Sequence, residues 1–529
     1  MKRISIVISF LLFSLSINAQ FKINRDSILN KDSLVKYNNL KFANTNEEKS
    51  FKDFIDTKNI NSGLKLLFYS KNESFNFDSI ENVLNKHISV LKNKTTDLSE
   101  KKKIRVIYDY IHNLFFDKYS YYAMFPDIFI NKTYNCLTAS ILYAYFLEKL
   151  EIPYEARLSN EHVYLLAYPG SFNIVMETTN PLSEISQITE KFKKDYINQL
   201  RELKLISQDE FSSLSVNDLF SKYYFQEDNV KFYDLIGSHY LNLSSLYIEK
   251  FNYYEAFKSI CKSHLISPYY KTIYSIIVVG AEIIQKNQYL KNEDAEILAI
   301  LSRFTDYGIS NEMVYSDFKT ITQNQLMEKN DTLMYSASYN SLINSINDTN
   351  LKSDISHYYF KSLSLHYLKL SDYENALSSI EKAFYTKSDN VESLMLLSDI
   401  FGAYFSKYYE NQDNYDEMYE RIQKYYLLNN EIKNTKTLGS FRLYYWIYKS
   451  NIQLNKLNIA EADKYLSQFE KLLPSKQTSS LSFDIQNIYI KFSMYYYKKY
   501  NNKKAKEYIS RGLKILPDNY ELNRHFKAL

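Results

Sequence analysis

The chain of 529 residues contains few of the residues that make tight turns or covalent cross-links. Its eight glycines and seven prolines are too few for an all-β protein, which needs many tight turns. Its two cysteines exclude a disulfide framework. A single bridge between Cys136 and Cys261 is not expected, because their predicted elements lie in different domains. The composition therefore favours a mainly helical protein, and the length favours more than one domain.

An excess of charge of one sign is also absent. Lys and Arg number 65 and Asp and Glu number 61, so the net charge of +4 gives no basic surface for a nucleic acid. The eight histidines are scattered, and the sequence has no His-Glu-x-x-His motif and no cysteine pair. It also has no phosphate-binding loop and no dinucleotide-binding fingerprint. We therefore expect no metal site, no cofactor and no nucleic-acid partner.

Only the N-terminus carries a long apolar run. Met1-Lys2-Arg3 forms a basic head, residues 4–17 are almost entirely apolar, and Ala19 supplies a small residue for cleavage. This order predicts a secretory signal peptide over 1–19, and hence a mature chain that is periplasmic or secreted, with no membrane span. The alternative, an N-terminal membrane anchor, is less favoured because the run is shorter than the ~20 residues of a span.

One of the two cysteines stands where a helix is expected to begin. Residues 20–95 have helical spacing without a signature, with helices expected over 49–60 and 77–91. A helix is expected over 103–116, and a second one starts at Cys136 and ends before Pro153. Unpaired backbone N–H groups and the helix dipole stabilise a thiolate at such a position. Cys136 is therefore a candidate nucleophile.

The segment from His162 to Glu177 changes to a period of two, which predicts a β-hairpin. A two-residue turn at Pro169-Gly170 would pair His162 directly with Glu177, with Cβ atoms ~5 Å apart. A longer loop with the same centre would keep this pairing, whereas an off-centre bulge would not. One face of the hairpin is wholly apolar and is expected in the core: Val163, Leu165, Ala167, Phe172, Ile174 and Met176.

Small residues recur beyond residue 236 at the spacing of paired helices. Four segments fit a ~34-residue helix–turn–helix repeat, with degenerate pairs expected over 275–350 and 391–440. The recurring positions are Ser244, Ala256 and Pro268; Ser364, Ala376 and Ala383; Ser450, Ala462 and Pro474; and Ser493, Ala505, Gly512 and Pro517. Aromatic runs such as Tyr444-Tyr445-Trp446 are expected to form the core of these repeats, and a ligand groove is the alternative.

Four short motifs together resemble the transglutaminase-like superfamily, and the repeats resemble tetratricopeptide repeats. The motifs are Asn135-Cys136-Leu-Thr-Ala-Ser, Ile152-Pro-Tyr-Glu-Ala, His162-Val-Tyr and Glu177-Thr-Thr-Asn-Pro181. The resemblance implies an α+β papain-like domain followed by an all-α tetratricopeptide-type solenoid. The expected divisions are 1–19 signal peptide, 20–95 N-terminal helical segment, 96–190 transglutaminase-like domain, 191–235 helical connector and 236–529 repeats.

The same resemblance implies a catalytic triad. Cys136 would be the nucleophile, His162 the general base and Glu177 the orienting acid, a position where the family more often has Asp. The oxyanion donors would be the backbone N–H of Cys136 with the side chain of Asn135 or Tyr134.

These residues predict a cysteine-dependent amide hydrolase or acyltransferase. The Cys136 thiolate would attack an amide or ester carbonyl, and the thioester would then meet water or an amine. The repeats would recruit a protein or peptide. The alternative is a non-catalytic scaffold, because a solenoid can bind extended partners without chemistry.

Overall fold

The computed structural model describes residues 34–70, 76–158, 163–177 and most of 185–529. Its gaps beyond residue 185 fall between 188 and 207 and at 224–227, 409–413 and 474–478. The predicted signal peptide and His162 lie outside the described residues. Helices form most of the described chain and the strands form two small sheets, so the mainly helical class is confirmed. None of the described helices has the length and apolar character of a membrane span.

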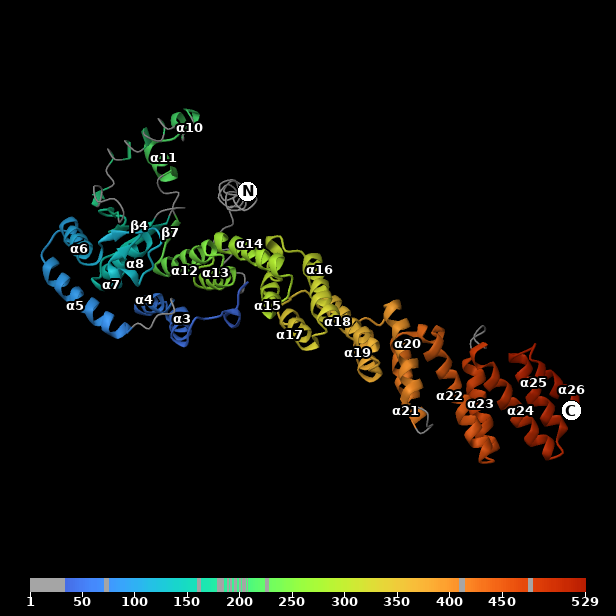
Figure 1. Ribbon diagram of the computed structural model, residues 1–529. Helices are drawn as coiled ribbons and strands as arrows, with labels where there is room; N and C mark the ends of the chain where they lie inside the picture. The colour runs from blue at the N-terminus through green and yellow to red at the C-terminus, as the bar shows by residue number, and fades with distance from the viewer. Residues whose placement is uncertain are drawn as a thin grey trace. The chain divides into compact units, whose positions relative to one another are not determined.

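The chain divides into two compact units, residues 1–309 and residues 310–529 (Figure 1). The first unit opens with α3 (Thr45–Thr57), α4 (Ile60–Tyr69), α5 (Phe77–Thr95) and α6 (Glu100–Phe115). The helices predicted over 77–91 and 103–116 correspond to α5 and α6. The helix predicted over 49–60 ends earlier, because Lys58 adopts a left-handed conformation (φ 52°) at the end of α3.

The predicted Cys136 helix is present as α8 (Cys136–Lys149), and a small parallel sheet precedes it. Strand β1 (Lys118–Tyr119) pairs with β2 (Thr133–Tyr134), and α7 (Asp127–Asn131) lies between them in the chain. The α8 residues from Leu137 to Leu147 are all buried. Helix α8 therefore runs through the core, and only its first residue and its last turn reach solvent.

The second sheet is antiparallel throughout and has the order β6-β5-β4-β3-β7. Its strands are β3 (Tyr154–Leu158), β4 (Val163–Ala167), β5 (Ile174–Met176), β6 (Ile185–Gln187) and β7 (Asp228–Val230). The β4–β5 hairpin confirms the predicted change of period. Five of the six predicted core residues, Val163, Leu165, Ala167, Ile174 and Met176, lie in the main core of the first unit.

The prediction of a two-residue turn at Pro169-Gly170 is wrong, because the loop is longer and is centred elsewhere. Strands β4 and β5 pair Ala167 with Ile174, so the loop is Tyr168–Asn173 and its centre lies one residue beyond Pro169-Gly170. Tyr168 and Asn173 both have positive φ, and the Tyr168 carbonyl accepts hydrogen bonds from three loop N–H groups. Phe172, which was expected in the core, lies in this loop and is exposed. The register therefore differs by two residues from one that would pair His162 directly with Glu177.

Two pairs of helices complete the first unit. The pairs are α12 (Phe232–Glu249) with α13 (Tyr253–Ile266), and α14 (Tyr270–Asn287) with α15 (Asn292–Leu301). Before them come the short helices α10 (Gln208–Ser213) and α11 (Val216–Tyr223). A capping box starts α11, because Ser215 and Asp218 exchange hydrogen bonds between side chain and backbone. Helix α12 packs against α8, so the first pair is part of the same body as the sheet.

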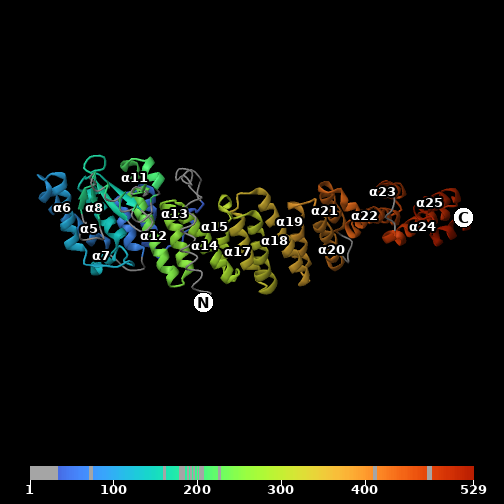
Figure 2. The same ribbon diagram turned by 90° about the horizontal axis from the view of Figure 1, so that it is seen from above.

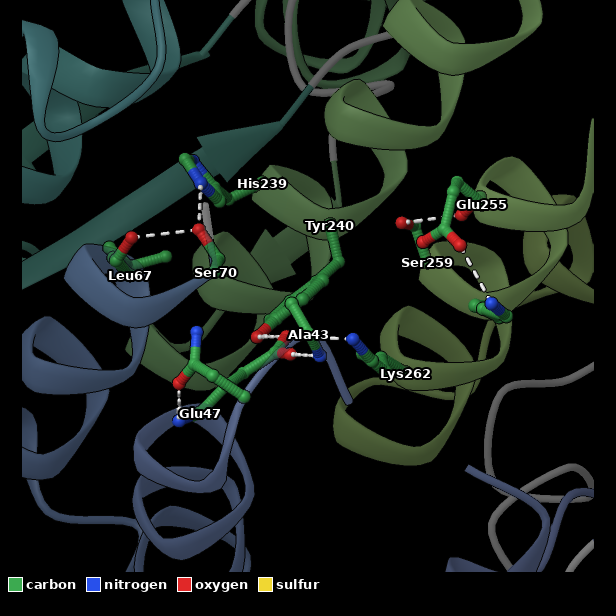
Figure 3. A network of polar contacts seen from close by, with 11 residues as sticks. Ala43, Glu47, Leu67, Ser70, His239, Tyr240, Glu255, Ser259 and Lys262 are labelled. Carbon is green, nitrogen blue, oxygen red and sulfur yellow. Dashed lines mark hydrogen bonds and ion pairs between the residues drawn. The ribbon is translucent and has the colours of Figure 1, made fainter. Parts of the chain in front are cut away.

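A buried carboxylate ties the N-terminal segment to the first helical pair (Figure 3). Glu47 of α3 is fully buried, and its Oε1 accepts hydrogen bonds from Tyr240 Oη at 2.8 Å and from Lys262 Nζ at 2.7 Å. Nearer the start of the segment, the Leu34 carbonyl accepts a hydrogen bond from the Arg303 guanidinium at 3.0 Å. The described part of the N-terminal segment therefore fastens these helical pairs to the rest of the unit.

The second unit consists of helices in the described part of residues 310–529 (Figure 2). It begins with α16 (Asn311–Ile321), a π-helical segment labelled η4 (Thr322–Glu328) and α17 (Thr332–Ile343). Four pairs follow: α18 (Thr349–Lys369) with α19 (Tyr373–Thr386), α20 (Val391–Tyr408) with α21 (Tyr415–Leu428), α22 (Lys436–Asn455) with α23 (Ile459–Leu472), and α24 (Ser482–Lys498) with α25 (Asn502–Ile515). The last helix is α26 (Tyr520–Ala528).

The small residues lie where the paired helices approach each other, as predicted. Ala376, Ala462 and Ala505 are fully buried, and Ser450 Oγ of α22 donates to the Ala462 carbonyl of α23 at 2.8 Å. The predicted ~34-residue spacing is too short, however. The first helices of the four pairs start at residues 349, 391, 436 and 482, which are 42, 45 and 46 residues apart. These first helices are 17 to 21 residues long, which accounts for much of the wider spacing.

The tyrosine-rich runs contribute mainly to these helix contacts. Tyr425 is fully buried, and Tyr445 is nearly so. The hydroxyl of Tyr445 donates to Asp416 at 2.8 Å, and the ring of Tyr445 stacks on Tyr419. These residues therefore belong to the core of the repeats, as predicted.

Candidate active site

Cys136 is the first residue of α8, and a reciprocal cap fixes the turn that carries it. Asn135 Oδ1 accepts from the Thr138 N–H at 2.9 Å, and Thr138 Oγ1 accepts from the Asn135 N–H at 2.9 Å. Cys136 is partly exposed, whereas Cys261 is buried inside α13. Burial raises the pKa of the Cys261 thiol far above its ordinary value. Cys136 is therefore the thiol that is placed to react.

The Asn135 side chain also holds the loop that precedes α7. Its Nδ2 donates to the Tyr121 carbonyl at 3.0 Å and to the Ala123 carbonyl at 2.9 Å. An amide group has two N–H hydrogens, and both are used here. The side chain is thus suited to positioning Cys136 rather than to donating to an oxyanion. The backbone N–H of Cys136 lies in the first turn of α8, where N–H groups do not bond within their own helix.

Tyr134 and Tyr119 lie side by side ahead of Cys136. They are partners in the β1–β2 pair, and their rings meet edge to face with centroids 5.8 Å apart. Tyr134 is buried, whereas Tyr119 is about half exposed. Burial, and then a negative charge on Cys136, raise the pKa of the Tyr119 hydroxyl above 10.0. Tyr119 thus lies within electrostatic reach of the thiol. Tyr119 could not be found from the sequence, because a two-residue strand has no periodicity.

A hydrogen bond joins the Cys136 helix to the start of β4. Ser140, one helical turn after Cys136, donates its hydroxyl to the Val163 carbonyl at 3.3 Å. Val163 is the first described residue after the predicted general base, His162. The start of β4 therefore lies against α8, the helix that begins at the predicted nucleophile Cys136.

The predicted acid, Glu177, directly follows β5 and is partly buried. Its backbone carbonyl accepts a hydrogen bond from Tyr108 Oη of α6 at 2.7 Å. The Tyr108 ring stacks on Tyr143 of α8 at 5.1 Å and 7°, and Tyr143 Oη donates to the Tyr108 carbonyl at 3.4 Å. The main chain at Glu177 is thereby linked through Tyr108 to the helix that carries Cys136.

A second imidazole lies beside this cluster. His112 of α6 stacks on Tyr108 at 5.7 Å and meets the edge of Tyr134 at 6.1 Å. Its Nδ1 atom is buried and makes no hydrogen bond to the described part of the protein. His112 lay within a predicted helix, but nothing in its sequence neighbourhood pointed to Tyr134. The described residues hold no group of three His, Cys, Asp or Glu side chains fit for a metal ion.

Comparison with known proteins adds no family to these observations. A scan against protein-family models finds no match, and a search of curated proteins finds no similar sequence.

Proposed function

We propose that this protein is an exported, transglutaminase-like cysteine enzyme that hydrolyses amides or transfers acyl groups. One observation carries the proposal: the Ser140–Val163 hydrogen bond joins the Cys136 helix to the strand that follows His162 in the chain. The order Cys136, His162 and Glu177 supplies a nucleophile, a base and an orienting acid. The capped, partly exposed position of Cys136 further supports this role.

In the proposed reaction, His162 takes the proton of the Cys136 thiol, and the thiolate attacks a carbonyl carbon. The negative oxygen of the tetrahedral intermediate accepts hydrogen bonds from the Cys136 N–H, with the Tyr119 hydroxyl as a second donor. The bond to the leaving group breaks as His162 returns the proton to it. Water or an amine then attacks the thioester, and the thiol is regenerated. We assign the orientation of the His162 imidazole to Glu177 by the order of the three residues in the chain, because the β4–β5 register does not pair these two residues directly.

The finer fold we propose is a papain-like α+β core with tetratricopeptide-type helical pairs after it. The packing of α8 on β4 supports the first part, and the small residues buried between paired helices support the second. We further propose that residues 1–19 are a signal peptide. N-terminal sequencing of protein recovered outside the cytoplasm should begin at Gln20, and a chain that begins at Met1 would contradict this.

The enzyme proposal is tested with a thiol-directed probe that carries a carbonyl electrophile. The full-length protein should be labelled at Cys136 within minutes near pH 7, and Cys136→Ser should remove the label. Peptides from a digest identify the modified residue. Labelling no faster than that of a free cysteine in solution would contradict the proposal.

The alternative function is a non-catalytic scaffold for protein binding. Exposed apolar residues along the helical pairs of the second unit favour it, since such surfaces mark interaction sites. The two functions differ in thiol chemistry, because a scaffold requires no reactive Cys136.

A further inference from the structure

The second unit has a groove at the junction of α20, α21 and the residues that follow α21. Its volume is about 570 Å³, which is within the range of ~300–1,000 Å³ typical of ligand sites. The start of α20 and the end of α21 form its walls. The groove lies entirely within residues 389–434, and no part of it belongs to the candidate active site.

The walls of this groove expose an unusual concentration of apolar surface. Val391 and Met395 of α20 are 64% and 48% exposed, and Leu427 and Leu428 of α21 are 84% and 51% exposed. Large apolar side chains scattered singly on a surface are ordinary, but a cluster around a concave site marks a binding surface. These four side chains are therefore suited to contact apolar side chains of a ligand.

The base of the groove is already ordered by internal contacts. Leu394 beneath it is buried, and the Arg442 guanidinium covers one face of the Tyr426 ring at 3.9 Å. Asn429 ends α21 in an extended conformation and donates from Nδ2 to the Ser388 carbonyl at 2.7 Å. A ligand thus meets a preformed surface and does not have to order it, which favours binding.

Both charged residues in the described lining of the groove are acidic, and the Arg442 guanidinium on the Tyr426 ring is a cation beside it. Asp389 and Glu431 line it and are both exposed, and its described lining contains no Lys or Arg. The nearest cation in sequence before it, Lys387, forms an ion pair with Asp354. Two carboxylates beside an apolar surface attract a cationic group and repel an anionic one.

We propose that this groove binds a peptide segment in which apolar side chains stand next to a Lys or Arg. The apolar side chains contact Val391, Met395, Leu427 and Leu428, and the cation lies between Asp389 and Glu431. This proposal specifies the kind of peptide that the helical pairs bind, and in that respect it rests on the function proposed above. It does not depend on the reactivity of Cys136.

The test is a peptide array probed with full-length protein that carries Cys136→Ser, so that capture reports binding and not acylation. The central positions of each peptide are drawn from leucine, phenylalanine, lysine, arginine, glutamate and serine, between flanks of glycine and serine. Peptides that combine apolar and basic central residues should bind best. The variant Leu427→Ser/Met395→Ser should bind them at least about tenfold more weakly. The variant Asp389→Asn/Glu431→Gln should lose the preference for lysine over glutamate.

The matched control is Leu333→Ser in α17, because Leu333 is 83% exposed and lies outside the groove. It should bind like the parent protein, and circular dichroism should show that all variants remain folded. The proposal is overturned if basic and acidic peptides bind equally, or if the groove variant binds as the control does. It is also overturned if the groove variant abolishes self-association, since the occupant would then be a second copy of the chain. Labelling of wild-type Cys136 is scored separately, so an inert thiol would refute the enzyme and leave this result standing.

Discussion

Ser140 donates its hydroxyl to the backbone carbonyl of Val163 at 3.3 Å, and this bond links the Cys136 helix to the central β4 strand. Ser140 lies one helical turn beyond the candidate nucleophile, and Val163 follows the candidate base in the chain. The two residues are 23 positions apart and belong to elements of different kinds. The bond thus fixes the end of the strand on which the proposed chemistry depends.

Ser140→Ala should slow the alkylation of Cys136 and lower stability by about 1–2 kcal/mol, because it leaves a buried carbonyl without its donor. Iodoacetamide kinetics and urea unfolding of the full chain measure the two effects. Ser244→Ala is the control, since the Ser244 hydroxyl is equally buried but bonds within α12, to Leu241 at 2.6 Å. It should alter stability and leave alkylation unchanged. An alkylation rate in Ser140→Ala equal to wild type would refute the positioning role.

Two substitutions at Asn135 should separate its two tasks. Asn135→Ala removes the cap and both loop contacts, so we expect a loss of about 2 kcal/mol and a slower reaction at Cys136. Asn135→Asp keeps an oxygen acceptor for the Thr138 N–H but has no donor for the Tyr121 and Ala123 carbonyls. It should retain the helix start and lose the fixed loop. Protease sensitivity of the loop, compared between the two variants, checks this. Equal protection in Asn135→Asp and wild type would be inconsistent with it.

Much of the site could be predicted from local sequence, because its key elements are governed by local rules. Asn135 and Thr138 flank Cys136 at the spacing of a helix cap, and the apolar spacing of α6 and α8 is clear. The hairpin centre could not be predicted, because Tyr168 adopts a left-handed conformation that usually favours Gly or Asn. Contacts between segments that are distant in the sequence could not be predicted either. Tyr119 and His112 have no signal of their own, and Glu47 meets Lys262 across 215 positions.

The buried pair of Glu47 and Lys262 should be essential to the first unit. Glu47→Gln leaves the Lys262 ammonium, which is nearly inaccessible to solvent, without a compensating charge. We expect a loss of about 3–5 kcal/mol in the free energy of unfolding. The double variant Glu47→Leu/Lys262→Met removes both charges and should recover most of the lost free energy of unfolding. Urea unfolding followed by circular dichroism measures each value. A Glu47→Gln midpoint equal to wild type would show that the pair contributes nothing.

Acid should weaken the first unit through His264. This residue is buried, its Nδ1 lies 2.8 Å from Thr272 Oγ1, and burial lowers its pKa from 6.5 to about 4. The unfolded chain therefore takes up a proton that the folded chain excludes. The stability that the neutral imidazole contributes is fully present above pH 6.5. It is lost as the pH falls towards 4, which lowers the free energy of unfolding by roughly 3 kcal/mol. In His264→Gln the unfolding free energy should depend less on pH over this range. An unchanged dependence would argue against the buried neutral imidazole.

The most direct test of the central claim is the pH dependence of iodoacetamide alkylation at Cys136, followed by mass spectrometry of the modified peptide. An ordinary cysteine is largely protonated at pH 7 and reacts slowly there. We predict fast alkylation at pH 7 in the wild-type protein, a large decrease in His162→Ala and a smaller one in Glu177→Gln. Slow alkylation at pH 7 with identical profiles for all three proteins would contradict the account and leave a helical binding scaffold in its place.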